Sequence, residues 1–373
     1  MRTRRFRLAA IAVLVSVAAF ASIARAAEAG PGRSLVMRWN GTKWVKFGTP
    51  DVAGGEELLG VDAVGKANAW AVGLHGSGQN AHPLILHWNG SKWSSQALPA
   101  TPGGSRLAAI DASSANLAWA VGSEGDGHPL ALRWNGQKWT KSDVPRVGDE
   151  PTQLRGVVTV SSSEAWAVGS HDSGTATLHF DGAHWAAVAT PTQGTANSSL
   201  AAVGAFGAGD VWSVGSVITG SGFVTLVQHF DGDSWKRSPV TLHSGDLDSV
   251  LPLSQHAIWA GGNHEGDVHQ TLAMHWPAAN PADFSVTSTK NPGGDSDNDV
   301  NGVAGKAGDI WIVGEYFNGT GVSTLTEHFN GSKWTVVHSP NGAQKLNLLD
   351  GVAAVPGSGR YWAVGFSTKN AIG

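Results

Sequence analysis

A seven-letter phrase recurs along the whole chain, and this repetition limits the possible folds more than any other feature of the sequence. HWNGSKW at residues 87–93 has close copies in RWNGTKW, RWNGQKW, HFDGAHW, HFDGDSW and HFNGSKW. A second phrase, Trp-Ala-Val-Gly or a variant of it, begins at Trp70, Trp119, Trp166, Trp212, Trp259, Trp311 and Trp362. The spacings are 49, 47, 46, 47, 52 and 51 residues, and a sustained period of this length indicates a solenoid or a propeller.

Each period predicts four short strands. In the second copy these are 107–112, 118–121, 130–134 and 138–142, which are rich in apolar, β-branched and aromatic residues and are separated by turn-forming residues. An Asn-Gly or Asp-Gly pair joins the third strand to the fourth in most copies. This pair is a strong hairpin signal, because a tight turn of that kind needs positive φ at both positions.

All seventeen tryptophans fall on repeat-equivalent positions. Seven begin the Trp-Ala-Val-Gly phrases, four precede the hairpin turn, and six follow it. A residue that is used only at equivalent places predicts packing between neighbouring repeats. A histidine column on the third strands, with Arg38 and Arg133 in two of the copies, is predicted to be structural for the same reason.

The expected fold is all-β: a seven-bladed β-propeller with four antiparallel strands per blade, spanning residues 33–373. The chain after residue 32 begins with a third and a fourth strand and ends with a first and a second. These four strands are predicted to form one closing blade, which hides both free edges of the ring.

Residues 1–26 have the layout of a secretory signal peptide, with arginines first, then an apolar run and a small-x-small site at 24–26. We therefore expect a secreted, extracellular protein of bacterial type, with no stable membrane anchor after cleavage.

The chain has no cysteine, which rules out disulfides. Removal of residues 1–26 with their five arginines leaves 20 basic and 29 acidic residues, a net charge of −9 that disfavours nucleic-acid partners.

The hairpin Gly90-Ser91-Lys92-Trp93 resembles the Asp-box hairpin of sialidase-type propellers, and the chain as a whole is similar to uncharacterised propellers secreted by soil bacteria. The acidic or amide residue stands one place closer to the tryptophan in this chain. Sialidase chemistry would imply an arginine triad and a tyrosine nucleophile. At the expected mouth of the propeller's central channel the sequence has only two arginines, Arg106 and Arg155, and the whole chain has only two tyrosines. The resemblance therefore implies the propeller architecture and not sialidase activity.

Chemistry is expected where the copies differ, on the face formed by the fourth-to-first and second-to-third connections. We call it the variable face. The first strands follow the pattern Leu-x-small-Val, and position x is predicted to line the central channel. The mouth of this channel on the variable face is predicted to have a basic side at Arg106 and Arg155 and an acidic side over the last three blades. The ligand-binding candidates on the acidic side are Asp246, Asp248, Asn301 and Asp350.

The segment 293–302, GGDSDNDVNG, carries the candidate metal ligands Asp295, Asp297 and Asp299. Alternating carboxylates can converge on one calcium ion, although this segment lacks the glycine turn and the distal glutamate of a calcium loop. The alternative is a polar loop without metal. The nearby run 264–269, HEGDVH, could supply a transition-metal site, since imidazoles and carboxylates are ligands of such ions.

Two departures from the repeat are assigned to the sixth blade. The Asn-Gly turn is replaced by residues 277–283, and the adjacent aromatic pair Tyr316 and Phe317 lies outside the repeat columns. These two features predict that any ligand contacts the sixth blade.

Together the observations favour a non-catalytic binding propeller that recognises a glycan, a cell-wall polymer or a protein through its variable face. The alternative is a carbohydrate-active enzyme, a lyase or glycoside hydrolase, that uses the carboxylates at the channel mouth with or without calcium.

Overall fold

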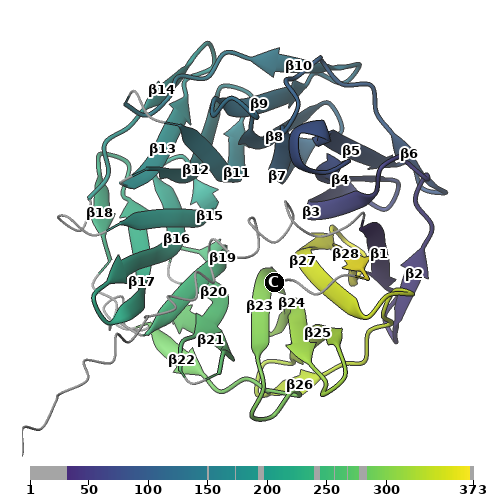
Figure 1. Ribbon diagram of the computed structural model, residues 1–373. Helices are drawn as coiled ribbons and strands as arrows, with labels where there is room; N and C mark the ends of the chain where they lie inside the picture. The colour runs from purple at the N-terminus through teal and green to yellow at the C-terminus, as the bar shows by residue number, and fades with distance from the viewer. Residues whose placement is uncertain are drawn as a thin grey trace, which may run out of the picture.

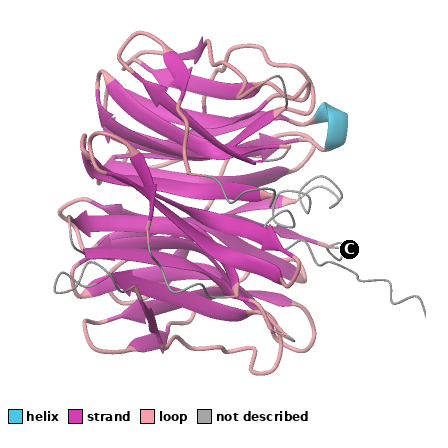
Figure 2. Cartoon of the chain, turned by 90° about the vertical axis from the view of Figure 1, so that its left-hand side faces the viewer, coloured by secondary structure: helices cyan, strands magenta, loops and turns pink. Residues whose placement is uncertain are grey.

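The computed structural model is a ring of seven four-stranded antiparallel blades around a central axis, as the sequence predicts (Figure 1). It describes residues 32–148, 151–172, 174–191, 197–238, 244–255, 257–266, 268–276 and 284–369, so the predicted signal peptide lies outside the described residues. In side view the strands run from one face of the ring to the other, and the 3-10 helix η1 (Gly78–Asn80) projects from the variable face (Figure 2). Within the described ranges, no helix qualifies as a membrane span.

The first six blades follow one another along the chain, with the first strand of each next to the axis. The first two contain β3 (Glu56–Gly65), β4 (Asn68–His75), β5 (His82–Trp88) and β6 (Trp93–Ser95), then β7 (Arg106–Ser114), β8 (Leu117–Ser123), β9 (Pro129–Trp134) and β10 (Trp139–Ser142). The third and fourth contain β11 (Thr152–Ser161), β12 (Glu164–His171), β13 (Gly174–Phe180) and β14 (Trp185–Ala187), then β15 (Ser198–Gly207), β16 (Asp210–Thr219), β17 (Gly222–Phe230) and β18 (Trp235–Arg237). The fifth and sixth contain β19 (Gly245–Ser254), β20 (Ala257–His264), β21 (Gln270–Trp276) and β22 (Ser285–Thr287), then β23 (Asn298–Lys306), β24 (Asp309–Phe317), β25 (Val322–Phe329) and β26 (Trp334–Val336).

The seventh blade is built from both ends of the propeller. Its strands are β27 (Leu346–Val355), β28 (Arg360–Thr368), β1 (Arg33–Trp39) and β2 (Trp44–Phe47). β1 pairs antiparallel with β28 along its whole length, from Arg33 opposite Ser367 to Trp39 opposite Tyr361. The ring is therefore closed by hydrogen bonds between the start and the end of the fold, as predicted.

The tryptophans pack blade against blade around the complete ring, which confirms the prediction from their positions. Trp70 of the first blade contacts Trp134 and Trp139 of the second, with ring centroids 5.0 and 5.3 Å apart. The same contact closes the ring, because Trp362 lies 5.1 Å from Trp88 of the first blade. Buried aromatic surface therefore fills the blade interfaces.

The histidine column is structural, also as predicted, because its rings lie against the tryptophans of their own blades. His229 stacks on Trp212 with centroids 4.0 Å apart, and its Nε2 lies 2.8 Å from Asp210 Oδ1. In the second blade the guanidinium of Arg133 lies 5.5 Å from the ring of Trp119 and takes the same place. The column thus packs against the tryptophans of the second strands.

The glycine that ends each Trp-x-x-Gly phrase is required by the first strand beside it. A Cβ on Gly169 would lie 1.9 Å from the carbonyl oxygen of Gln153, where β11 carries a bulge at Leu154 and Gly156. Equivalent glycines in the other six blades would place a Cβ 1.9–2.2 Å from the matching carbonyl. The phrase therefore recurs because only glycine lets the second strand pass this bulge.

The hairpin turns differ from the sequence prediction in their backbone geometry. Among the described residues only glycines have positive φ, so the asparagine or aspartate of each turn does not adopt it. Gly90 has φ of 96°, and Asn89 Oδ1 accepts the backbone N–H groups of Ser91 and Lys92, both at 3.0 Å. The prediction of positive φ at both positions was wrong, because a four-residue loop closed by the Asn side chain needs it only at glycine.

Candidate functional site

The central channel narrows at a ring of seven side chains, one from each blade. This ring, which we call the axial ring, encloses a cavity of about 100 Å³ and contains Leu59, Ala108, Arg155, Ala201, Asp248, Asn301 and Asp350. These are the seven x positions of Leu-x-small-Val, so the sequence pattern located the channel lining. A small residue follows each x because neighbouring first strands are very close: a Cβ on Gly156 would lie 2.9 Å from the Cα of Ala202.

The basic side of the mouth lies where β3, β7 and β11 meet on the variable face. Arg106 donates from its guanidinium to Gln153 Oε1 at 3.3 Å. Glu57, on the neighbouring first strand, is only 4% exposed, and its Oε2 has no hydrogen-bond partner among the described residues. Burial raises the pKa of Glu57 to about 7, an effect that the charge of Arg106 opposes. This mouth therefore holds an acid that changes charge near neutral pH.

We expect Glu57→Gln to stabilise the protein above pH 7. A carboxyl whose folded pKa lies above its ordinary value of 4.5 destabilises the fold above about pH 7, and this penalty fades as the pH falls to the ordinary value. Removal of the charge should therefore raise the free energy of unfolding by roughly 1–3 kcal/mol at high pH and by almost nothing at low pH. Denaturant unfolding across this pH range measures the difference. A constant difference, or a loss at high pH, would show that burial of the Glu57 carboxylate is not the cause.

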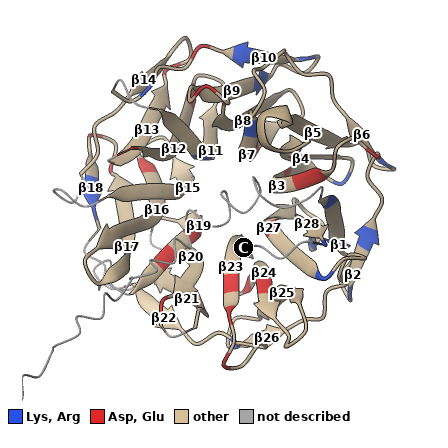
Figure 3. Ribbon diagram, in the orientation of Figure 1, with Lys and Arg blue, Asp and Glu red and all other residues tan. Residues whose placement is uncertain are grey.

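The acidic side gathers on the fifth and sixth blades, where Figure 3 shows red segments on β19, β23 and β24. His269 Nδ1 lies 3.0 Å from Asp299 Oδ1, and this hydrogen bond raises the pKa of His269. Burial raises the pKa of Asp246 to about 6, while His269 opposes the shift. The pKa of Asp248 is also raised by burial and by the neighbouring Asp246. The repeat pattern predicted Asp246 and Asp248 on this side, whereas His269 was considered only as part of a metal loop.

Amide side chains fix the geometry of this acidic side. Asn263 donates to Asp248 Oδ2 at 3.4 Å, and its Oδ1 accepts the backbone N–H of Val300 at 2.8 Å. Asn301 donates to Glu315 Oε2 at 2.7 Å and to the carbonyl oxygen of Leu349 at 3.0 Å. These amides join the fifth, sixth and seventh blades. Sequence reasoning missed Asn263 and Glu315, which stand in second strands where nothing in the repeat pattern marks them.

The candidate calcium ligands are not brought together. Asp295 and Asp297 are exposed, whereas Asp299 is buried at the start of β23. Asp297 Oδ1 accepts the backbone N–H of His269 at 3.0 Å, and Asp299 faces the imidazole of the same residue. Within the described ranges no group of three or more His, Asp or Glu side chains is placed to hold a metal ion. His269 thus contacts both carboxylates, that of Asp297 through its backbone N–H and that of Asp299 through its imidazole.

The aromatic pair lies at the variable-face end of β24. Tyr316 is half-buried against the core between the fifth and sixth blades, and Phe317 is exposed.

The strands that flank residues 277–283, β21 and β22, belong to the fifth blade, so the assignment of that insertion to the sixth blade was wrong. The insertion itself lies outside the described residues. The hairpin of β21 and β22 belongs to the same blade as the Trp259 phrase before it, and not to the blade of the Trp311 phrase after it.

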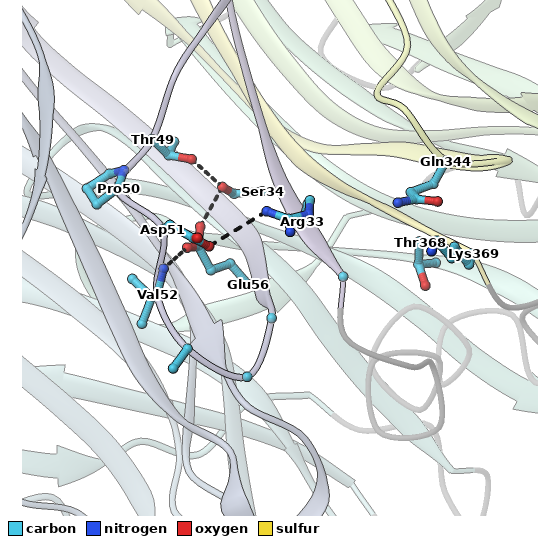
Figure 4. Close-up of a pocket in the computed structure, with 14 residues that line it drawn as sticks. Arg33, Ser34, Thr49, Pro50, Asp51, Val52, Glu56, Gln344, Thr368 and Lys369 are labelled. Atoms are coloured by element: carbon cyan, nitrogen blue, oxygen red, sulfur yellow. Dashed lines mark hydrogen bonds and ion pairs between the residues drawn. The ribbon is translucent and has the colours of Figure 1, made fainter.

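A larger pocket lies elsewhere on the variable face, at the seam where the closing blade meets the first (Figure 4). This seam pocket has a volume of about 540 Å³. Its polar lining comes from the start of β1, the loop before β3, the end of β28 and the loop before β27. The polar side chains are Arg33, Ser34, Thr49, Asp51, Glu56, Gln344, Thr368 and Lys369.

The carboxylates of the seam pocket already have partners. Glu56 is buried; its Oε2 accepts the hydroxyl of Ser34 at 2.6 Å, and its Oε1 accepts the backbone N–H of Val52. Asp51 Oδ1 lies 3.6 Å from Arg33 in an exposed ion pair. The pocket therefore presents hydroxyl, amide and cationic groups without a free pair of carboxyls for acid–base chemistry.

Comparison with known proteins supports the fold and leaves the family open. No family model and no curated protein matches the chain. Among solved structures it is similar to YCF48 from Cyanidioschyzon merolae, with a TM-score of 0.55 and 16% identity over 84% of this chain and 97% of that one. It is also similar to a GH74 xyloglucanase from Xanthomonas campestris, with a TM-score of 0.58 and 15% identity over 86% of this chain and 52% of that one. The SapL1 lectin in complex with alpha methyl fucoside gives a TM-score of 0.51 and 13% identity over 76% of this chain and 97% of that one.

These three proteins share the propeller architecture at an identity that shows the fold alone. They include a lectin and a xyloglucanase, so both binding and carbohydrate chemistry occur on this architecture. The shared fold therefore does not specify the function of the present chain.

Proposed function

We propose that this protein is a secreted, non-catalytic propeller that binds an extracellular glycan or protein through its variable face. The observation that carries the proposal is the seam pocket of about 540 Å³, a volume typical of small-ligand sites. Its hydroxyl, amide and guanidinium groups suit a hydroxyl-rich ligand, and both of its carboxylates are already engaged. Since the pocket is concave and offers several hydrogen-bonding side chains, we favour a glycan or cell-wall polymer over a flat protein surface as its ligand.

A second candidate function rests on the cluster of Asp246, Asp248, His269 and Asp299. Raised pKa values of neighbouring carboxyls are characteristic of acid–base catalysis, and Asp246 with a pKa of about 6 is one such group. A lyase or glycoside hydrolase would use this cluster at the channel mouth. The two functions predict different fates for a bound polymer.

A panel of immobilised polysaccharides and peptidoglycan fragments tests both functions. We expect binding to at least one polymer that persists on prolonged incubation and is unchanged by a chelator. Release of soluble fragments from the bound polymer would establish the enzyme instead. Loss of binding on chelation would show that calcium has a role that the arrangement of Asp295, Asp297 and Asp299 does not support.

A further inference from the structure

The larger part of the central channel lies toward the face opposite the proposed ligand site. Between the axial ring and the face of the Asn-Gly turns, the first strands enclose a cavity of about 490 Å³. We call this cavity the inner chamber. All seven blades line it. The repeat pattern does not mark this region as a site. The Asn-Gly turns on this face are nearly the same in most blades, and sites were expected where the blades differ.

Apolar side chains form one part of the wall of the inner chamber. Two places after each axial-ring residue stands a valine or isoleucine, such as Val61, Ile110 and Val157, and these three are only 6–8% exposed. Beyond them the lining includes Pro252 and Pro356. A ligand with an apolar body could therefore contact these side chains inside the chamber.

The charged groups of the inner chamber are mostly acidic. Among the described residues that line it, Arg155 is the one Lys or Arg. The acidic lining residues are Asp62, Asp111, Asp248 and Asp350. The chamber thus combines apolar side chains with an excess of carboxyls.

Two of these carboxyls are held in place by the neighbouring first strands. Asp62 Oδ2 accepts the backbone N–H of Ala112 at 2.8 Å, and Asp111 Oδ2 accepts that of Thr159 at 2.7 Å. Burial and the neighbouring Asp111 raise the pKa of Asp62 to about 7. Burial raises the pKa of Asp111 as well. Carboxyls in such surroundings favour a cation that offsets the cost of their charge.

We propose that the inner chamber binds a small organic cation with an apolar body, of the alkyl- or arylammonium class. The valine and isoleucine side chains of the wall contact the body, and the carboxyls of Asp62, Asp111 and the axial ring take the ammonium group. The volume of about 490 Å³ admits a molecule of this kind. The site is independent of the seam pocket, which lies on the other face.

The probes are benzylammonium, benzyl alcohol and benzoate, which have similar bodies and different charges. Calorimetric titration of the full chain should give binding of benzylammonium at least about tenfold tighter than of benzyl alcohol, with no binding of benzoate. Asp62→Asn, which keeps an acceptor for the N–H of Ala112, and Asp111→Asn should each lower the affinity several-fold. The control Asp295→Asn, which removes an exposed charge on the variable face, should leave it unchanged.

A further variant does not depend on charge. Ala201 lines both the axial ring and the inner chamber and is not part of the apolar core between the third and fourth blades. Ala201→Phe should therefore fill the channel without disturbing the blade packing, and it should abolish binding. Equal affinity for all three probes, absence of binding, or an unchanged charge preference in the Asp62→Asn/Asp111→Asn double variant would overturn the proposal. None of these results bears on polymer binding at the variable face.

Discussion

Replacement of Trp212 by alanine is expected to lower the free energy of unfolding by about 3–5 kcal/mol, a large fraction of the stability of most domains. Trp212 is fully buried; its ring lies 4.0 Å from that of His229 in its own blade and 4.2 Å from that of Trp276 in the next. The alanine variant loses the aromatic contacts that Trp212 makes between the fourth blade and the fifth. Denaturant unfolding followed by tryptophan fluorescence measures the loss.

The matched control is Val336→Ala, which truncates an apolar side chain that is 45% exposed on an outer strand. Its effect should stay below about 0.5 kcal/mol. If Trp212→Ala costs no more than this control, the tryptophans do not hold the blades together, and their recurrence needs another explanation.

Gly169→Ala is expected to be at least as damaging as many core truncations, although it adds only one methyl group. The new Cβ would lie 1.9 Å from the carbonyl oxygen of Gln153, which belongs to the adjacent backbone and cannot rotate away. The bulge of β11 would have to shift, at a cost of about 3 kcal/mol, the upper end of the usual range for overpacking. The melting temperature of the variant, measured by circular dichroism, should fall by several degrees.

Gly48→Ala provides the comparison, because no atom lies within 4 Å of the position that its Cβ would take. This substitution should change the melting temperature little. Equal effects at the two positions would show that the close approach of the first strand does not require the glycine of the Trp-x-x-Gly phrase.

The fold could be predicted because the same pattern recurs in all seven blades. Each Leu-x-small-Val segment encodes a first strand, and each Trp-x-x-Gly phrase encodes the second strand that passes its bulge. The backbone of the hairpin turns could not be derived in the same way. The letters Asn-Gly suit both a two-residue turn and the observed four-residue loop, and the choice depends on the side-chain bonds of residues such as Asn89.

The axial ring was also predictable, since its residues occupy one position of the repeat. The seam pocket was not, because Arg33, Thr49, Gln344 and Thr368 come from distant parts of the sequence and meet only when the ring closes. The run 264–269 was considered as a candidate transition-metal site because of its neighbouring letters, whereas the partner of His269 in space is Asp299. Side chains in connecting loops carry no periodic signal, and their partners depend on the path of each loop.

The most direct test of the proposed function compares the two faces of the ring. Gln344→Trp places a large ring at the seam pocket, and Gln137→Trp places the same ring at an exposed hairpin turn on the opposite face. Affinity for the polysaccharide or peptidoglycan fragment that wild type binds best would be measured for all three proteins. We predict at least about a tenfold loss in Gln344→Trp and no change in Gln137→Trp. Unchanged binding in Gln344→Trp, or a loss confined to Gln137→Trp, would contradict ligand binding at the seam pocket.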